Sequence, residues 1–365
     1  MKQISWITGD YFLDVDLPII PLLSNHYQIC WHIVLPSQKS RYSKNEILKS
    51  IPNNVTVHFY IQKKRLRNPI NIVFYWNIIT RLKKDKSDYY YINYQGFPYL
   101  AFISQLLLPQ EKTIFTVHQA VSHSGMRHGV ITNMYFNYLY KKFKYYHVYS
   151  KTQQTIFEKL YCKKTYLIPL TLKDFGISTQ LPPKNRIVFM NFGRIIKSKN
   201  IGLLIEAACS LYEEGYKNFI VKICGSCDNW NYYKKLIKYP DIFDLRIEQI
   251  PNEDISNLFG TSHYFILPYS AISQSGQLKI GLNYNIPIIA SDLEEFKNDI
   301  RDNETGYLFE NNNLESLISV MKKAIDKHNS NYIDLKREQL KDREKYTTNS
   351  ISKLYLNLFK SINNE

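Results

Sequence analysis

The sequence predicts an α/β protein made of two doubly wound, Rossmann-like parallel sheets in series, followed by C-terminal helices. Short runs rich in β-branched and aromatic residues alternate with stretches of helical length and spacing in both halves of the chain. Strands and helices that alternate through short links are typical of parallel sheets. The length of 365 residues fits two domains, each large enough to bury its own core.

Seven apolar runs in the first half predict buried strands, because their side chains are mostly β-branched or aromatic. They cover residues 4–8, 28–34, 55–60, 89–93, 113–117, 145–149 and 165–168. Helical spacing follows in the stretches between them, at residues 71–83, 98–108, 126–142 and 151–161. We therefore predict an N-terminal domain over residues 1–175.

The alternation of strands and helices is interrupted at residues 171–185, where Gly176, Ser178 and the pair Pro182-Pro183 predict a linker. It then resumes with a helix at 201–212 and with predicted strands at 187–192, 219–223, 245–248, 264–267 and 287–290. The last fifty or so residues predict two or three helices. We therefore predict a C-terminal domain over residues 186–345 and a final helix over residues 346–365 that returns to the N-terminal domain.

One helix start is predicted in detail. Asn252 is a suitable N-cap residue, and Glu253 and Asp254 follow it in what would be the first turn. Asparagine is favoured at N-caps, and acidic residues interact favourably with the positive end of a helix. We therefore expect a helix that begins after Asn252.

The positive charge lies almost entirely in the first half. The formal net charge is +15, of which residues 1–180 carry +14 and residues 181–365 carry +1. Basic clusters at 63–67, 81–86 and 141–144 adjoin apolar, aromatic stretches at 72–79 and 134–140. This pattern favours an anionic membrane surface as a partner of the first domain. A nucleic acid, a phosphorylated substrate and a merely solvated basic face are the alternatives.

The chain has no apolar run of 18 residues, and its N-terminus lacks the apolar core of a signal peptide. We therefore expect no membrane-spanning helix and predict a cytoplasmic protein that is peripherally associated with the inner face of the membrane.

The cysteines do not predict a disulfide framework or a metal site. There are five of them, scattered along the chain. Cys224 and Cys227 have the spacing of a zinc or redox pair, but no second pair of ligands with suitable spacing accompanies them. We interpret their spacing as coincidence.

Three loops that follow predicted strands contain candidate ligand-binding residues, since ligands bind at the carboxyl ends of parallel strands. The first begins with Gly193-Arg194 and ends near Lys199, so two cations could converge on one anion. The second runs through Ser273, Gln274, Ser275 and Gly276 into a helix, whose first N–H groups could bind a phosphate. An ordinary serine N-cap is the alternative for this loop.

The third loop follows residues 113–117 and contains His118 and His123. Two histidines in such a loop could contact a polyhydroxylated ligand, although a single histidine is more often structural. No further histidine or carboxylate lies close enough in sequence to suggest a metal site.

Taken in order, these motifs resemble glycosyltransferase family 4, a large family of retaining enzymes with the GT-B fold. The resemblance rests on Gly193-Arg194 with Lys199, 205–208, 267–269, 273–276, 287–290, Thr305-Gly306 and the His118 loop, which is similar to the family's His-Asp-Pro-x-Pro-His-Ser-Gly segment. It covers residues 113–310 in order, and the rest of the chain more loosely. It implies two Rossmann-like domains that face each other across a cleft.

The resemblance implies the roles of individual residues. A nucleoside-diphosphate sugar donor would bind to Gly193, Arg194, Lys199 and the loop Ser273 to Gly276, with the two cations neutralising the diphosphate. His118 would contact the sugar and act with Arg194 and Lys199 in catalysis. Gly9, His118 and His123 would contact the acceptor or the sugar. The family needs no metal, and the cations and helix N-terminus offer the electrostatic stabilisation that the leaving diphosphate requires.

The sequence departs from the family in its donor loop. Many members have two glutamates eight positions apart there, whereas residues 273–281 contain no carboxylate. A branch with a Ser/Thr-Gln-Ser-Gly loop lacks the pair as well, and this chain resembles that branch. The Gly-Gly that usually follows residues 287–292 is also replaced, here by Glu294-Glu295.

We therefore expect a metal-independent glycosyltransferase without a cofactor, acting in surface-polysaccharide biosynthesis. It would transfer a sugar from the donor to a polysaccharide or a lipid-linked oligosaccharide, with retention of configuration. The alternatives are a basic nucleic-acid-binding protein and a catalytically inactive GT-B scaffold. No nucleic-acid reader module stands out in the sequence, so we expect no nucleic-acid partner.

Overall fold

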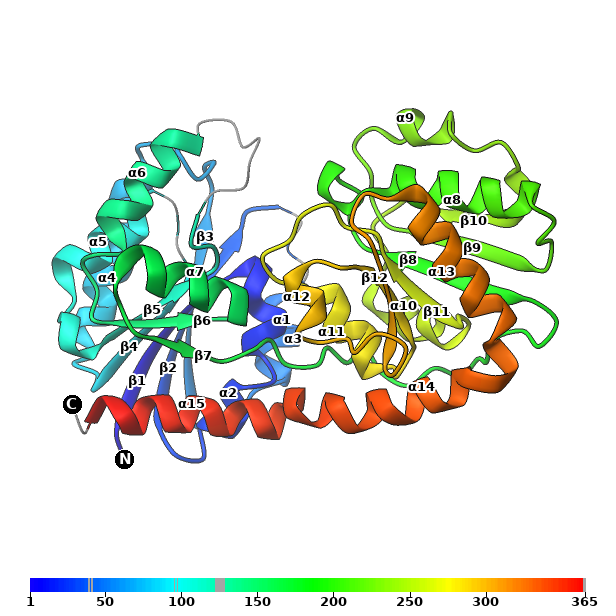
Figure 1. Ribbon diagram of the computed structural model, residues 1–365. Helices are drawn as coiled ribbons and strands as arrows, with labels where there is room; N and C mark the ends of the chain where they lie inside the picture. Colours follow the sequence, from blue (N-terminus) through cyan, green and yellow to red (C-terminus); the bar gives the residue numbers. More distant parts are fainter. Residues whose placement is uncertain (39, 41, 95, 97, 122–128, 364–365) are drawn as a thin grey trace. The chain divides into compact units, whose positions relative to one another are not determined.

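The computed structural model describes residues 1–38, 40, 42–94, 96, 98–121 and 129–363, and the chain forms two compact units (Figure 1). The first unit consists of Met1–Thr171 together with Thr347–Glu365, and the second consists of Leu172–Tyr346. Each unit contains one parallel sheet between two layers of helices.

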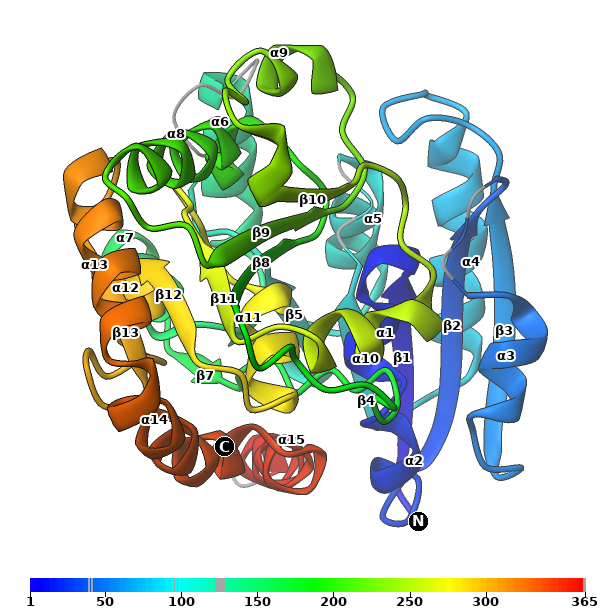
Figure 2. The same cartoon turned by 90° about the vertical axis from the view of Figure 1, so that its right-hand side faces the viewer.

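The sheet of the first unit is parallel throughout and has the strand order β3-β2-β1-β4-β5-β6-β7. Figure 2 shows β1, β2 and β3 side by side at one edge of it. Its described strands are β1 (Gln3–Gly9), β2 (Gln28–Pro36), β3 (Val55–Gln62), β4 (Tyr89–Asn93), β5 (Thr113–Val117), β6 (Tyr145–Val148) and β7 (Thr165–Leu167). Nearly every residue of β1, β2 and β4 to β6 is buried, as expected for strands covered on both faces.

Each face of this sheet has its own helices and its own apolar core. One core contains residues of α4 (Asn71–Lys84), α5 (Tyr99–Leu107), α6 (Gly129–Leu139) and α7 (Lys151–Tyr161). The other contains residues of α1 (Leu13–Asp16), α2 (Ile20–Leu23), α3 (Lys44–Lys49) and α15 (Thr348–Asn363). The alternation of side chains along each strand divides them between the two cores: Ile7 lies in the first and Trp6 in the second.

The sheet of the second unit is also parallel and has the order β10-β9-β8-β11-β12-β13. Its described strands are β8 (Ile187–Phe192), β9 (Phe219–Cys224), β10 (Phe243–Arg246), β11 (Tyr264–Leu267), β12 (Ile288–Ser291) and β13 (Gly306–Phe309). One core contains residues of α8 (Ile201–Glu213), α13 (Leu314–Asp326) and α14 (His328–Arg343), with α9 (Trp230–Lys234) at its margin. The other contains residues of α10 (Asn252–Gly260), α11 (Gly276–Asn283) and α12 (Glu294–Lys297).

Most predicted strands coincide with observed ones to within one or two residues, but some details of the prediction are wrong. The strand expected at 245–248 ends at Arg246 and begins earlier, at Phe243. Asn252 is the first residue of α10 rather than its N-cap, which is Pro251. The helix expected at 126–142 is observed as α6, and residues 126–128 lie outside the described residues. The prediction had no counterpart for β13 or for the short helices α3, α9 and α12.

The segment predicted as a linker does not lie free between the units. Leu172 and Phe175 pack against the α10–α12 core, and the Leu172 N–H donates to the Tyr346 carbonyl over 2.9 Å. The chain therefore enters the second unit directly after Thr171 and leaves it after Tyr346.

Candidate functional site

Two of the predicted loops follow the two strands at which the strand order of the second sheet reverses. β8 lies between β9 and β11, so the chain runs outwards from β8 and returns to its other side with β11. In open α/β sheets such a switch point opens a crevice at the carboxyl ends of the strands, where ligands bind. The Gly193–Lys199 loop follows β8, and the loop to Ser275 follows β11.

Gly193 allows the first loop to turn sharply beside the second. Its φ of +116° is a conformation that side chains rarely adopt, and its N–H donates to the Cys224 carbonyl over 2.9 Å. A Cβ at this position would lie 2.8 Å from Nε2 of Gln277, in the first turn of α11. Glycine is therefore required here both by the backbone conformation and by the close approach of Gln277.

The two predicted cations have different environments. Arg194 is exposed, and its guanidinium donates to Oδ2 of Asp228 over 2.8 Å. Both side chains of this pair are more than half exposed, so it contributes little stability and leaves the guanidinium available to a ligand.

Lys199 is part-buried, and its ammonium group lies over the ring of Tyr269, 3.6 Å from the ring centroid. The Nζ atom also donates to Oε1 of Gln277 over 3.3 Å. Burial lowers the pKa of Lys199 to about 7, because desolvation disfavours the charged ammonium form. Arg194 is therefore exposed to solvent, whereas Lys199 is largely desolvated.

The second loop is fixed to the first by the backbone. The Ser270 N–H donates to the Ser198 carbonyl over 3.0 Å. Ser275 is the N-cap of α11, and its hydroxyl accepts from the Leu278 N–H over 3.1 Å. The hydroxyl of Ser275 thus acts as an ordinary cap, while Ser273 and Gln274 lie half-buried on the same loop.

A third cation lies at the start of α11. A Cβ at Gly276 would lie 2.8 Å from Nζ of Lys173, so this amine is close to the first helical residue. The first turn of a helix carries partial positive charge and N–H groups without helical partners. Lys173, Lys199 and the first turn of α11 together form an electropositive surface suited to a phosphate or diphosphate.

In the first unit, His118 follows β5 and has no hydrogen-bond partner among the described residues. Both of its ring nitrogens are buried, and its ring packs against Phe12 at a centroid distance of 4.0 Å and against Tyr149 at 5.8 Å. Burial lowers the pKa of His118 to about 3, with a smaller effect of His147. A neutral imidazole with unused hydrogen-bonding capacity is suited to a ligand hydroxyl.

The other predicted residues of the first unit have different outcomes. Gly9 ends β1 and lies so close to Tyr94 that a Cβ there would approach the ring to 2.3 Å. The close packing of Tyr94 therefore accounts for a glycine at this position, and a role of Gly9 in ligand binding stays a prediction. His123 lies outside the described residues.

Several groups at this site were not assigned a role from the sequence. Tyr269 and Gln277 hold Lys199, and Lys173 lies about a hundred positions before α11. Tyr269 lies two residues after the end of β11, and this position at a strand end is a usable signal. Lys173 has none, because only the packing of residues after 171 on the second unit brings it to α11.

The sequence of the second unit is similar to that of a known protein family. Residues 174–346 match the sequence model of a family described as glycosyl transferases group 1. No curated protein sequence matches the chain.

Solved structures with the same fold cover nearly the whole chain. A glycosyltransferase from Rickettsia africae has a TM-score of 0.75 at 16% identity and covers 99% of this chain and 98% of its own. Alr3699/HepE from Anabaena, solved with UDP and glucose, has a TM-score of 0.76 at 13% identity and covers 99% and 100%. WaaG, a glycosyltransferase involved in lipopolysaccharide biosynthesis, has a TM-score of 0.69 at 13% identity and covers 96% and 97%.

The matches confirm the predicted GT-B fold class, and they identify residues 174–346 as a glycosyltransferase domain. The predicted donor loops, Gly193–Lys199 and Ser273–Gly276, both belong to this domain. The match therefore favours an enzyme over the nucleic-acid-binding alternative. None of the helices in the described part of the chain is both long enough and apolar enough to cross a membrane.

Proposed function

We propose that this protein transfers a sugar from a nucleoside-diphosphate sugar to a polysaccharide or a lipid-linked oligosaccharide, with retention of configuration, in surface-polysaccharide biosynthesis. The convergence of the β8 and β11 loops on one electropositive surface carries the proposal. Arg194, Lys199 and the first turn of α11 would surround the diphosphate, and Gly193 would let it approach the backbone. The structural neighbour HepE was solved with UDP and glucose, which supports a nucleotide-sugar donor.

The reaction would proceed by electrostatic stabilisation of the leaving diphosphate. Negative charge develops on this group as the bond to the sugar breaks, and donors that are already oriented lower the barrier without reorganising. Arg194 and Lys199 supply charge from one loop, while α11 supplies N–H groups and its dipole from the other. His118 would bind a sugar hydroxyl as a neutral imidazole. In this proposal, the reaction needs neither a metal nor a cofactor.

The donor is tested by thermal unfolding of the full chain with UDP, GDP, ADP and CMP. A ligand at 100 times its dissociation constant stabilises a protein by about 2.7 kcal/mol, and we expect this shift with one nucleoside diphosphate. The Lys199→Ala variant should lose the shift, whereas Lys197→Ala, on an exposed side chain of the same loop, should keep it. Absence of a shift with all four nucleotides would contradict the proposed donor class.

Turnover distinguishes the enzyme from an inactive scaffold. The preferred nucleoside diphosphate is offered as its sugar conjugates, and release of the nucleotide is followed with and without a saccharide or polyprenyl-linked acceptor. We expect release that depends on the acceptor. Tight binding of a nucleotide sugar without any release would favour the scaffold.

We also propose that the first unit docks on an anionic membrane, where a lipid-linked acceptor would be met. The helices α4, α5 and α6 are neighbours on one face of the sheet, and they expose apolar side chains that we call the apolar patch: Ile72, Val73, Trp76, Phe102, Leu106, Met134 and Tyr138. Exposed basic residues lie at the end of α4 or close in sequence to α4 and α6: Lys63, Lys64, Arg65, Arg67, Arg81, Lys83, Lys84, Lys86, Lys141, Lys142 and Lys144.

Aromatic and apolar side chains next to basic ones are typical of an interfacial surface. At about 1 kcal/mol for each basic residue near an anionic leaflet, several of them suffice for reversible docking that salt weakens. We expect the full chain to co-sediment with anionic liposomes but not with zwitterionic ones.

Paired variants make this test specific. Trp76→Ser on the apolar patch should weaken sedimentation, whereas Ile333→Ser, at an exposed apolar position of α14 in the second unit, should not. Equal effects of the two variants would overturn the membrane proposal. Release of the protein from the liposomes by nucleic acid at a concentration below that of the lipid would overturn it as well.

A further inference from the structure

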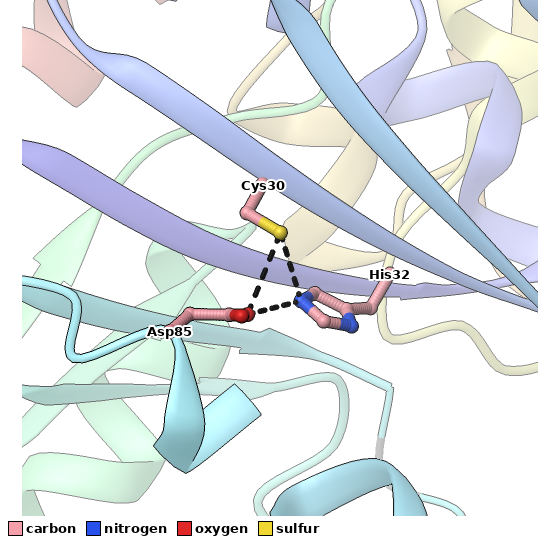
Figure 3. Close-up of side chains that lie close together, drawn as sticks. All are labelled: Cys30, His32 and Asp85. Atoms are coloured by element: carbon pink, nitrogen blue, oxygen red, sulfur yellow. Dashed lines mark hydrogen bonds and ion pairs between the residues drawn. The ribbon is translucent and has the colours of Figure 1, made fainter. Parts of the chain in front are cut away.

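Three potential metal ligands of the first unit converge on one point (Figure 3). Sγ of Cys30 lies 3.3 Å from Nε2 of His32 and 3.4 Å from Oδ2 of Asp85, and the latter two atoms are 3.1 Å apart. Cys30 and His32 are buried, and the Asp85 side chain is 14% exposed. Among the described residues, it is the one group of three or more cysteine, histidine and acidic side chains whose ligand atoms are close enough together to hold a metal ion.

The fold places these side chains together without a local sequence motif. Cys30 and His32 are two residues apart on β2, so both point to the sheet face that α4 covers. Asp85 is the C-cap residue of α4, and its N–H donates to the carbonyls of Leu82 and Lys83. The loop from α4 to β4 thus brings the carboxylate to the amino-terminal half of β2.

The arrangement differs from that of a nucleophilic triad. In a triad, the nucleophile and the carboxylate bond to opposite nitrogens of the histidine. Here the thiol and the carboxylate both approach Nε2, while Nδ1 lies 2.9 Å from the hydroxyl of Tyr60. A partner on the other ring nitrogen is what orients a metal-ligating histidine.

The distances suit a tetrahedral site. Zinc bonds of about 2.3 Å to sulfur and about 2.0–2.1 Å to nitrogen and oxygen place such ligands about 3.4–3.6 Å apart at tetrahedral angles. The observed separations, 3.1–3.4 Å, are slightly shorter, so a small outward movement of the side chains would accommodate the ion. Thiolate, imidazole and carboxylate together are the ligand types that zinc binds.

We propose that Cys30 Sγ, His32 Nε2 and Asp85 Oδ2 bind a divalent zinc-class ion, with water or His58 in the fourth position. His58 pairs with His32 in the register of β3 and β2, and the ring centroids are 5.1 Å apart. Binding displaces the thiol proton of Cys30, because thiolate is the form that ligates metals.

The site has a structural role rather than a role in sugar transfer. It lies towards the amino ends of the strands, beside Ser5 near the start of β1. The hydroxyl of Ser5 is 3.4 Å from Oδ2 of Asp85. The residues proposed to meet the sugar follow the carboxyl end of β5. A metal here would connect β2 to the link between α4 and β4.

The first experiment measures metal content and cobalt binding in the full chain, made without a metal-binding tag and purified without chelator. We expect about one zinc ion for each chain. After removal of the zinc, one equivalent of Co²⁺ should give the intense visible bands of a tetrahedral site together with a thiolate-to-cobalt charge-transfer band. A metal-free protein that also fails to bind Co²⁺ would overturn the proposal.

A matched pair of variants tests the ligands. Cys30→Ser should lose the charge-transfer band and the rise in melting temperature that zinc gives to the metal-free protein. Cys209→Ser replaces another buried free cysteine, in the second unit, and should keep both signals. If Cys30→Ser does not fold, Asp85→Asn takes its place, since Asp85 is at a helix end and partly exposed. This variant keeps the thiolate, so it should weaken Co²⁺ binding and reduce the rise in melting temperature with zinc rather than remove the charge-transfer band. Equal cobalt spectra in the wild type and in a folded ligand variant would overturn the proposal.

Discussion

Arg194 and Lys199 carry the same charge but are held in different ways. Arg194 is exposed and paired with Asp228 at the surface, whereas Lys199 is desolvated over Tyr269 and bonded to Gln277. Sequence reasoning identified both residues because each follows a strand end in a glycine-containing loop. The environment of Lys199 could not be predicted, because it depends on Gln277 and Tyr269 from the other loop.

We expect Arg194→Ala and Lys199→Ala each to reduce the rate of sugar transfer about 10²–10³-fold, because each removes an oriented charge from the developing anion. The melting temperature should change little, since the Arg194–Asp228 pair is exposed and the Lys199 amine has no carboxylate partner among the described residues. Steady-state kinetics and calorimetry measure both effects, with Lys197→Ala as the control. Wild-type turnover by either variant would contradict the assignment.

The lowered pKa of Lys199 predicts a pH dependence of donor binding. With a pKa of about 7, this amine is largely neutral above that pH in the free protein, and the diphosphate must bind with uptake of a proton. Affinity should therefore be highest below pH 7 and fall by up to about tenfold for each pH unit above it. A nucleotide sugar is the suitable probe, because its diphosphate does not titrate near neutrality.

Calorimetric titrations at pH 6.5, 7.5 and 8.5 measure this dependence. Lys199→Arg should bind with nearly constant affinity over the same range, since a guanidinium stays charged. A wild-type affinity that is constant over this range would show that Lys199 is not at the diphosphate.

At the scale of elements, α11 is the helix on which the proposed donor site depends. Ser275 caps it, Gln277 in its first turn meets both Gly193 and Lys199, and Lys173 lies at its first residue. In the proposed site, Lys173, Lys199 and the first turn of α11 would supply the positive charge that a divalent cation supplies in other enzymes that cleave diphosphates. The one Asp-x-Asp triplet, Asp14 to Asp16, belongs to the first unit.

Asp16 has little capacity left for a metal. It is buried, and its carboxylate accepts hydrogen bonds from Trp6, Thr8 and Asn93. We therefore expect sugar transfer to continue in excess EDTA at a temperature well below the melting temperature. The zinc site proposed above lies in the first unit, so chelation should lower the melting temperature rather than the rate. Loss of activity in EDTA that magnesium or manganese restores would contradict this account.

The elements predicted best from the sequence are the buried central strands. β4, β5, β8 and β11 match the predictions residue for residue, because both of their faces are covered and most of their side chains are apolar or aromatic. β10 lies at the edge of its sheet and exposes two of its four residues, so its pattern is weak and its position was misjudged. The short helices α9 and α12 have too few turns to show periodicity.

The Cys30–His32–Asp85 cluster likewise could not be predicted from local sequence patterns. Asp85 is more than fifty positions from His32, and only the return of the chain from α4 to β4 brings it to β2. Short-range spacing therefore gave no indication of these ligands, whereas the donor loops were found because each is contiguous in sequence.

At the scale of the whole molecule, the chain crosses between the units twice. The first unit is completed by residues after Tyr346, and α15 covers the face of its sheet that carries Trp6 and Tyr91. A fragment of residues 1–180 would expose this apolar face, so liposome experiments require the full chain. The packing of residues after 171 on the second unit was not predictable, because this Pro- and Gly-containing segment has the composition of a linker.

The contribution of α15 to the first unit can be measured at Phe359. This side chain is fully buried, and its ring lies 5.2 Å from that of Tyr89, 5.4 Å from that of Tyr27 and 6.3 Å from that of Tyr91. We expect Phe359→Ala to lower the free energy of unfolding of the first unit by about 3–5 kcal/mol, which is typical of a buried Phe→Ala change. Leu354→Ala, at a partly exposed position of the same helix, should cost far less.

Hydrogen exchange followed by mass spectrometry assigns this loss to a unit. If α15 stabilises the sheet of the first unit, amides of β1, β2 and β4 should exchange faster in Phe359→Ala, while those of β8, β9 and β11 keep their wild-type rates. The distinction is sharp because the apolar contacts of Phe359 all belong to the first unit. Equal acceleration in both sheets would mean that the units unfold together, and unchanged exchange in β1 and β4 would mean that α15 is not part of this core.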